Sequence, residues 1–225
     1  MSANPAERRL QQRALVGVSI GHAAHDSWYG LAPVLLASLS PQLGLSNSEI
    51  ALALLLYQAF SSISQLFFGR LSERVSSRVL GVSAIVWTTL MFSAVTFAGS
   101  KWLLALFIGL AGFGSGAWHP QGTANATLAG GQRWAATATS IFFLGGTLGS
   151  AVLGAGLGGV LLDAFGRPAL LLVSAITLLL AFTLVRSLVP ATPVHRPQQG
   201  STEATAHSQA AAQTDGARRT FLALV

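Results

Sequence analysis

The segment ALVGVSIGHAAHDSWYGLAPVLLASL, residues 14–39, decides how the chain is interpreted, because it sets two histidines and a carboxylate inside an apolar run. A helix needs roughly 20 predominantly apolar residues to cross about 30 Å of hydrocarbon, and this run is long enough. An ionisable side chain inside such a span is costly, so it usually faces a cavity or a partner helix. The sequence therefore predicts a functional site around His22, His25 and Asp26.

The composition of the whole chain indicates a membrane setting. Hydrophobic residues make up 52% of the 225 residues and charged residues only 9%, whereas a soluble domain carries about 25% charged residues. The net charge is +6, but the basic residues lie between apolar runs, so nucleic acid is not expected as a partner. There is no cysteine, which excludes disulfides and thiolate metal sites. We predict an all-α membrane protein with the lipid bilayer as a partner.

Six apolar segments are predicted to span the membrane as helices, since barrel strands would alternate apolar and polar residues. The polar and helix-bending residues lie in the first and fourth segments, and the third and sixth are bland, which predicts an inverted 3+3 repeat. After the first segment, a turn and a helix start are expected, with Ser46 or Asn47 as N-cap and Glu49 in the first turn. The six segments are Ala14–Leu39, Ser48–Leu66, Val79–Ala98, Trp102–Ala124, Ala135–Leu162 and Pro168–Val189.

Basic residues predict the orientation and the domain plan. With the N-terminus inside, eleven of the 13 basic residues fall in inner segments, and Lys101 and Arg167 fall outside. We therefore expect both termini in the cytoplasm and a multi-pass protein of the cell inner (plasma) membrane. The predicted plan is a cytoplasmic N-terminus over 1–13, a six-helix bundle over 14–190, a disordered cytoplasmic linker over 191–217, and the start of a truncated seventh helix over 218–225.

The polar residues of the first segment predict a proton or substrate pathway. On a helix, residues four apart share a face, so His22, Asp26 and Gly30 form one stripe, which Tyr29 flanks. We expect Asp26 to bind and release a proton and His22 to line the pathway. The alternative is a His–Asp hydrogen bond that only locks helix packing. His25 lies off the stripe and is expected to serve packing or to lie at the interface.

The fourth segment carries a second polar face. Pro120 removes a backbone donor, so it is expected to bend the helix beside a cavity. If the inverted repeat is right, the first and fourth helices face one cavity, and His119 approaches Asp26 from across it. On the second segment, Gln58 and Gln65 lie seven residues apart and either extend the polar lining or join helices by hydrogen bonds.

Glycines and loop charges complete the set of candidate residues. Gly154 and Gly158 in the fifth segment belong to small-xxx-small spacings, which predict a tight helix crossing. In the loop after the second segment, Glu73 stands among arginines, either as ordinary topology charge or as a partner of Arg74 or of a helix N-terminus. No Walker loop with its Gly-Lys-Ser/Thr ending is present, so ATP is not expected to drive transport, and no cofactor is expected.

Four stretches together resemble the major facilitator superfamily, and within it the fosmidomycin-resistance branch of drug exporters. In the loop stretch, Glu73 stands where Asp is usual and Ser76 where Gly is usual, and in the antiporter-like stretch Ala155 replaces a proline. The resemblance covers about residues 14–190. The stretches are His22-x-x-x-Asp26-x-x-x-Gly30-x-x-Pro33, the loop from Gly69 to Arg78 with Arg74 inside it, Gly112 to Gly122 with His119-Pro120, and Gly154-Ala155-Gly156-Leu157-Gly158-Gly159.

The resemblance implies the N-terminal half of a transporter in which two six-helix halves rock around a central site. It also implies that the loop over residues 69–78 acts as a conformational latch against the other half. Such a partner would be a C-terminal half, a separate chain or a second copy of this chain.

The leading hypothesis is therefore a secondary active transporter, with proton-coupled efflux of a small drug-like or anionic compound. One alternative is an intramembrane metal-dependent enzyme, since three imidazoles and a carboxylate would suit zinc. Against it, His22 and His25 are three residues apart, without the His-x-x-x-His spacing, and no further general base is evident. We expect no catalytic residue and no metal. The other alternative is a non-transporting fragment.

Overall fold

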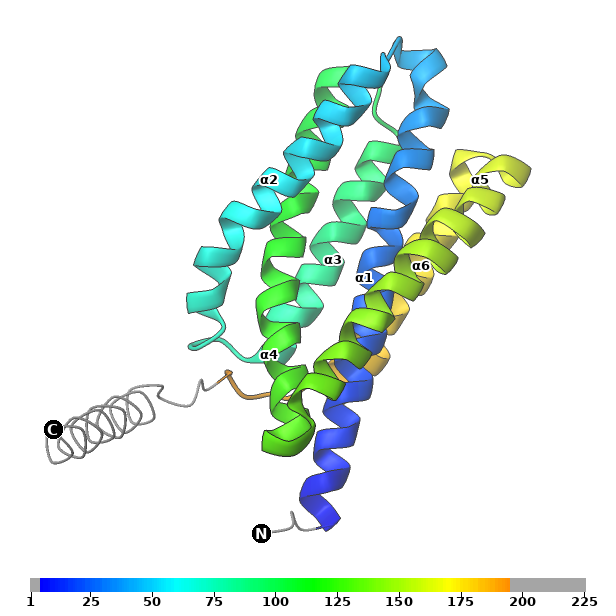
Figure 1. Cartoon of the computed structure of the whole chain (residues 1–225). Helices are drawn as coiled ribbons and strands as arrows, with labels where there is room; N and C mark the ends of the chain where they lie inside the picture. Colours follow the sequence, from blue (N-terminus) through cyan, green and yellow to red (C-terminus); the bar gives the residue numbers. More distant parts are fainter. Residues whose placement is uncertain (1–4, 195–225) are drawn as a thin grey trace, which may run out of the picture. The chain divides into compact units, whose positions relative to one another are not determined.

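The computed structural model describes residues 5–194, and within this range every regular element is a helix (Figure 1). This agrees with the predicted all-α class. The elements in chain order are α1 (Pro5–Leu43), α2 (Asn47–Leu71), α3 (Ser77–Thr96), α4 (Lys101–Leu148), the π-helix η1 (Gly149–Gly158), α5 (Gly159–Phe165), the short η2 (Arg167–Ala169), α6 (Leu170–Leu180), η3 (Ala181–Val185) and α7 (Arg186–Leu188).

The long helix α4 reverses direction at Gly131. The backbone there has φ 56° and ψ −166°, a left-handed conformation that glycine adopts without the steric cost of a Cβ. Figure 1 shows the chain running to the end of the bundle where α1 begins and returning toward α5. The reversal falls between the predicted fourth and fifth segments. Pro120, where the sequence predicts a bend, lies inside the helical part before the reversal.

Within the described residues, four stretches are long and apolar enough to cross a membrane: Asn47–Leu71, Ser77–Thr96, Lys101–Phe165 and Arg167–Val185. The third of these contains both arms of the reversal. The polar residues of α1 dilute its apolar run, and α1 is outside this set. The count of six spanning segments therefore stays a prediction.

Capping residues indicate where the helices begin better than the ends of the apolar runs do. Ser46 is the N-cap of α2: its hydroxyl accepts from the Glu49 backbone N–H at 3.2 Å, and the Glu49 carboxylate accepts from the Ser46 N–H at 2.9 Å. This reciprocal capping box confirms the predicted helix start. Near the N-terminus, α1 begins at Pro5 rather than at Ala14, because proline is favoured in the first turn of a helix and the polar residues that follow it continue the same helix.

Two groups of buried apolar residues hold the bundle, and the polar residues of α1 lie between them along the helix. Trp28 belongs to the first group and stacks on Phe92 of α3 at 5.5 Å between ring centroids. Val18 and Trp118 belong to the second group. Consequently residues 22–26 lie between two apolar groups along α1.

Helix α1 contacts the returning arm of α4 and η1 almost backbone to backbone. A Cβ added at Gly145 would lie 2.6 Å from the Ser19 carbonyl oxygen, and one at Gly154 would lie 2.9 Å from the Leu31 nitrogen. The step from Gly149 to Gly154 is five residues, and a π-helix keeps residues five apart on one face. The structure thus places Gly154 in the close contact that the small-residue spacing predicts. Gly158, the other glycine predicted to pack, lies in the same contact and faces Leu31, and Gly30 of α1 faces the backbone of Ser150.

The segment after α7 is tied to the loop between α2 and α3. The backbone N–H groups of Ser77 and Arg78 donate to the carbonyls of Thr192 and Pro190, at 3.0 and 2.9 Å, and Val194 donates to Ser72 at 2.9 Å. Residues 191–194, predicted as the start of a disordered linker, are therefore held in place by main-chain hydrogen bonds. The rest of that linker, 195–217, and the predicted helix start over 218–225 lie outside the described residues.

Candidate functional site

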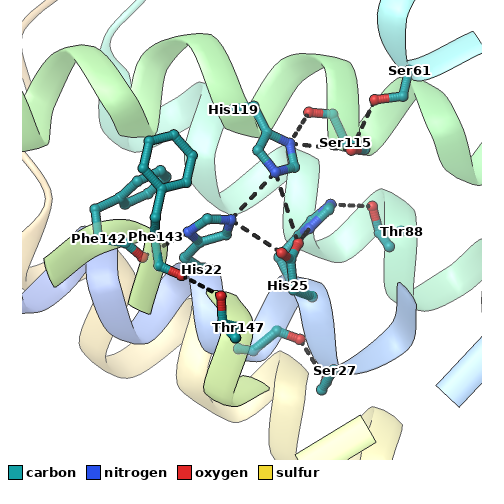
Figure 2. A network of polar contacts seen from close by, with 12 residues as sticks. His22, His25, Ser27, Ser61, Thr88, Ser115, His119, Phe142, Phe143 and Thr147 are labelled. Carbon is teal, nitrogen blue, oxygen red and sulfur yellow. Dashed lines mark hydrogen bonds and ion pairs between the residues drawn. The ribbon is translucent and has the colours of Figure 1, made fainter. Parts of the chain in front are cut away.

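Three histidines surround one carboxylate inside the bundle (Figure 2). His22 Nε2 lies 3.1 Å from Asp26 Oδ2, and His25 Nδ1 lies 2.8 Å from Asp26 Oδ1. His119, from α4, brings its Nε2 to 3.9 Å from Asp26 Oδ1 and 3.3 Å from His22 Nε2. The fourth helix thus faces the first across the site, as the inverted repeat predicts.

Backbone carbonyls hold two of these imidazoles in one tautomer. His22 Nδ1 lies 2.8 Å from the Phe142 carbonyl oxygen, and the ring stacks on Phe142 with centroids 4.0 Å apart. His119 Nδ1 lies 2.9 Å from the carbonyl oxygen of Ser115. A carbonyl oxygen only accepts, so each Nδ1 carries the hydrogen. In the neutral form, each Nε2 then carries a lone pair directed into the site.

His25 belongs to this cluster, although its position off the stripe predicts a packing role. Its Nδ1 donates to Asp26, and its Nε2 lies 3.2 Å from the Thr88 hydroxyl of α3. The ring is fully buried. Helical spacing misses the contact because adjacent residues point about 100° apart, yet a long imidazole reaches the carboxylate of the next residue. A buried Thr88 on a neighbouring helix is not visible as a partner in one sequence.

A polar cavity of about 300 Å³ opens beside the cluster, between α1, α2 and α4. Asp26 and His119 form one side of it, and their side chains are 16% and 26% exposed, whereas His22 is only 3% exposed. The carboxylate is therefore reached from the cavity, and His22 and His25 lie behind it. The cavity is lined by Asp26, Tyr29, Tyr57, Gln58, Ser61, Gln65, Ser115 and His119.

Four of the five residues predicted for a pathway line this cavity: Asp26, Tyr29, Gln58 and His119. The fifth, His22, does not line it but contacts Asp26, which does. Gln58 and Gln65 both extend the lining, the first of the two roles considered for them. Tyr57 is an addition: it is buried and stacks on Tyr29 at 5.4 Å between ring centroids. From the sequence, a tyrosine in an apolar segment that lines a cavity cannot be distinguished from one that only packs against other helices.

Among residues 5–194, His22, Asp26 and His119 form a group whose donor atoms could hold a metal ion, because these atoms lie within 4.8 Å of one another. Imidazole and carboxylate are ligands that zinc accepts. A proton shared among these side chains would use the same three donor atoms of His22, Asp26 and His119. The geometry is therefore compatible with either a proton or a metal ion at this position.

The other candidate residues lie away from this cavity. Arg78 donates from Nε to the Val189 carbonyl oxygen at 3.1 Å, so it joins α3 to the segment after α7. Glu73 and Arg74 are exposed, and among the ion pairs of residues 5–194 none includes Glu73. Nothing lies within 4 Å of a Cβ added at Gly69. Pro33 is on an exposed face of α1.

Comparisons with known proteins agree with an all-helical transporter fold. Residues 19–224 match the Major Facilitator Superfamily. None of the curated proteins compared with the chain matches it. Two solved structures of a mutant of the peptide transporter POT, in complex with alafosfalin and with sulfate, both have a TM-score of 0.61. Their identities are 16% and 15%, and the match covers 96% of this chain but 50% and 49% of theirs.

Identities this low show the shared fold alone, and the chain spans about half the length of the solved transporters it matches. The family match covers nearly the whole chain, and the family is one of membrane transporters. This finding overturns the alternative of an intramembrane enzyme. The chain therefore belongs to the major facilitator superfamily.

Proposed function

We propose that this chain supplies the N-terminal half of a secondary active transporter that exports a small drug-like or anionic compound in exchange for protons. The motifs that resemble the fosmidomycin-resistance branch support this choice of substrate class. In this proposal Asp26 is the coupling carboxylate, His22 and His119 share its proton, and Tyr29 and Gln58 line the substrate path. The protein lies in the inner membrane with both termini in the cytoplasm, and a second six-helix half completes it.

One observation carries the proton-coupling part of the proposal: the Nε2 acceptors of His22 and His119 meet each other and the Asp26 carboxylate, which has a donor in His25 Nδ1 on another side but none from these two rings. The Nε2 atoms of His22 and His119 are 3.3 Å apart, and each faces Asp26. With both Nδ1 hydrogens donated to carbonyls, two neutral rings would direct lone pairs at each other and at a carboxylate. One added proton on either Nε2 converts this repulsion into a charge-assisted hydrogen bond. The arrangement is thus built to accept a single mobile cation.

The surroundings of Asp26 allow that proton to be exchanged. The titratable side chains around it are His22, His25 and Tyr29 from α1, Tyr57 from α2 and His119 from α4. Only the face of Asp26 toward the cavity is open, so protons and substrate reach the cluster from the same side. An ionisable group placed at this depth is costly unless it serves such a pathway.

The test replaces Asp26 by Asn, which keeps the shape and removes the charge. We reconstitute the full-length or reassembled transporter, which contains this chain and its second six-helix half, in liposomes that contain a pH-sensitive dye, impose a proton gradient, and add fosmidomycin as the probe. The proposal expects a probe-dependent change of internal pH that Asp26→Asn reduces to the level of empty liposomes. Asp163→Asn is the matched control, because Asp163 is exposed at the end of α5 and outside the cluster, and it should behave as the parent chain does.

A second measurement follows the proton without requiring transport. Isotope-edited NMR of the histidine nitrogens should show Nε2 of His22 or His119 gaining a proton as the pH falls, and Asp26→Asn should move that transition. An unchanged transition, or a stoichiometric transition metal in the purified chain, would overturn proton exchange at this site. Flux that survives Asp26→Asn would overturn the coupling role of the carboxylate.

A further inference from the structure

A cavity that shares no lining residue with the cavity at Asp26 lies where α1 begins and α4 reverses. Its volume is about 760 Å³. Arg8 and Gln12 come from the first turns of α1, and Gln132, Arg133 and Trp134 follow the reversal at Gly131. Figure 1 shows the start of α1 and the reversal of α4 at the same end of the bundle. We call this the α1–α4 end pocket.

The charge of the end pocket is positive and uncompensated. Arg8 and Arg133 both line it, no carboxylate is among its lining residues, and neither arginine takes part in the ion pairs of the described residues. Both arginines are exposed. Two guanidinium groups with neighbouring glutamine amides offer many N–H donors and few acceptors, which suits a phosphate with several oxygens.

Apolar side chains line the part of the pocket that is further along α1 and along the arm of α4 after Gly131, together with Gln11 and Thr137. Leu15, Ala138 and Ile141 line that side, and Ile141 is 44% exposed on the outside of the helix. Trp134 is 58% exposed, and the Arg133 guanidinium lies over its ring, 5.4 Å from the centroid. A tryptophan beside an arginine at a helix end is typical of the membrane–water boundary. The pocket therefore has arginines at one end and apolar side chains further in, as a phospholipid has a charged head group and apolar acyl chains.

We propose that the α1–α4 end pocket binds one anionic phospholipid, with its phosphate between Arg8 and Arg133 and an acyl chain along Ile141. Basic pockets between transmembrane helices hold anionic head groups in this way. A free phosphate would satisfy only the arginines and would leave the apolar side unused, so a lipid matches more of the pocket. This proposal is independent of proton exchange at Asp26.

Binding there would act on the same helices that form the proton site. One wall of the pocket is α1, which carries His22 and Asp26. The other wall is the arm after Gly131, which carries Phe142, and the Phe142 carbonyl accepts the hydrogen bond of His22. A lipid that bridges Arg8 and Arg133 therefore ties together two helices whose relative position sets that hydrogen bond.

The experiment is a lipid titration of the purified chain in detergent by native mass spectrometry. We compare phosphatidylglycerol and cardiolipin with phosphatidylcholine, and add inorganic phosphate as a competitor. The expected result is one tightly held anionic lipid per chain. The Arg8→Gln, Arg133→Gln double variant should weaken that lipid by about thirtyfold, from about 1 kcal/mol for each arginine near a lipid surface, whereas Lys at both positions should retain most of the affinity.

The matched control removes the same charge elsewhere: Arg70→Gln with Arg74→Gln affects two exposed arginines, one in the last turn of α2 and one in the α2–α3 loop, that do not line the pocket. Equal loss in this control would mean general electrostatic attraction and would overturn the site. Displacement of the lipid by millimolar inorganic phosphate would assign a phosphate site and overturn the lipid. If phosphatidylcholine bound as tightly as the anionic lipids, both the anionic-lipid site and the phosphate site would be overturned. Circular dichroism of each variant verifies that the fold is retained, and the lysine variant decides the case if the glutamine variant unfolds.

Discussion

A methyl group at Gly149 tests the close contact between α1 and η1. A Cβ there would lie 2.5 Å from the Ala23 Cα and 2.7 Å from its carbonyl carbon, and these are backbone atoms that no rotamer change can move. Overpacking of this kind costs about 1–3 kcal/mol, against a gain of about 0.5–1 kcal/mol for Ala over Gly in a helix. We therefore expect Gly149→Ala to lower the free energy of unfolding by roughly 0.5–2 kcal/mol.

The control is Gly159→Ala, ten residues further along the same arm. An added Cβ there meets only Val34 Cγ1 at 3.7 Å, an ordinary contact, so this variant should be neutral or slightly stabilised. Denaturant unfolding in detergent, followed by tryptophan fluorescence, measures both. Because Ala23 is next to His22, Gly149→Ala should also lengthen the hydrogen bond from His22 to Phe142, which histidine NMR detects. Equal stability of the two alanine variants would refute the argument that backbone contact limits this crossing.

Two further predictions concern hydrogen bonds at helix ends. Ser46→Ala removes the capping box of α2 and should cost about 1 kcal/mol, seen as a lower unfolding midpoint and faster amide exchange at Glu49; an unchanged midpoint would contradict it. Arg78→Ala removes the bond from Nε to the Val189 carbonyl oxygen and should speed amide exchange at Val194, whereas Arg74→Ala, an exposed neighbour, should not. Equal exchange in these two arginine variants would show that Arg78 does not hold the segment after α7.

The helical class and most helix positions can be predicted from the sequence, because a helix that contacts lipid requires a long continuous run of apolar residues. Continuous apolar runs give the helices, and Ser46 with Glu49 gives the start of α2, since capping depends on residues three apart. The ends of α1 and α4 are less predictable. Polar residues from Pro5 onward extend α1 beyond the apolar run, and the second arm of α4 begins directly after Gly131 rather than at Ala135.

The candidate site is predictable in part. Spacing of four places His22 and Asp26 on one face, and the cost of polar groups in lipid marks them for attention. The same reasoning does not reveal that His25 also contacts Asp26, because a contact between adjacent residues depends on side-chain reach rather than on helical face. Tyr57 and Thr88 are missed because each contributes through a neighbouring helix that the periodicity of its own segment does not identify.

Composition and spacing are enough to predict an all-α membrane protein whose first helix carries His22 and Asp26 beside a family-like pattern of glycines and prolines. These properties depend on composition and on spacing within one helix. Only the tertiary structure decided that the Nε2 atoms of His22 and His119 meet 3.3 Å apart, that His25 completes the cluster, and that Arg8 lies in one pocket with Arg133. Distances between residues on different helices depend on how those helices pack, and close glycine contacts such as that of Gly149 with Ala23 set this packing in three dimensions.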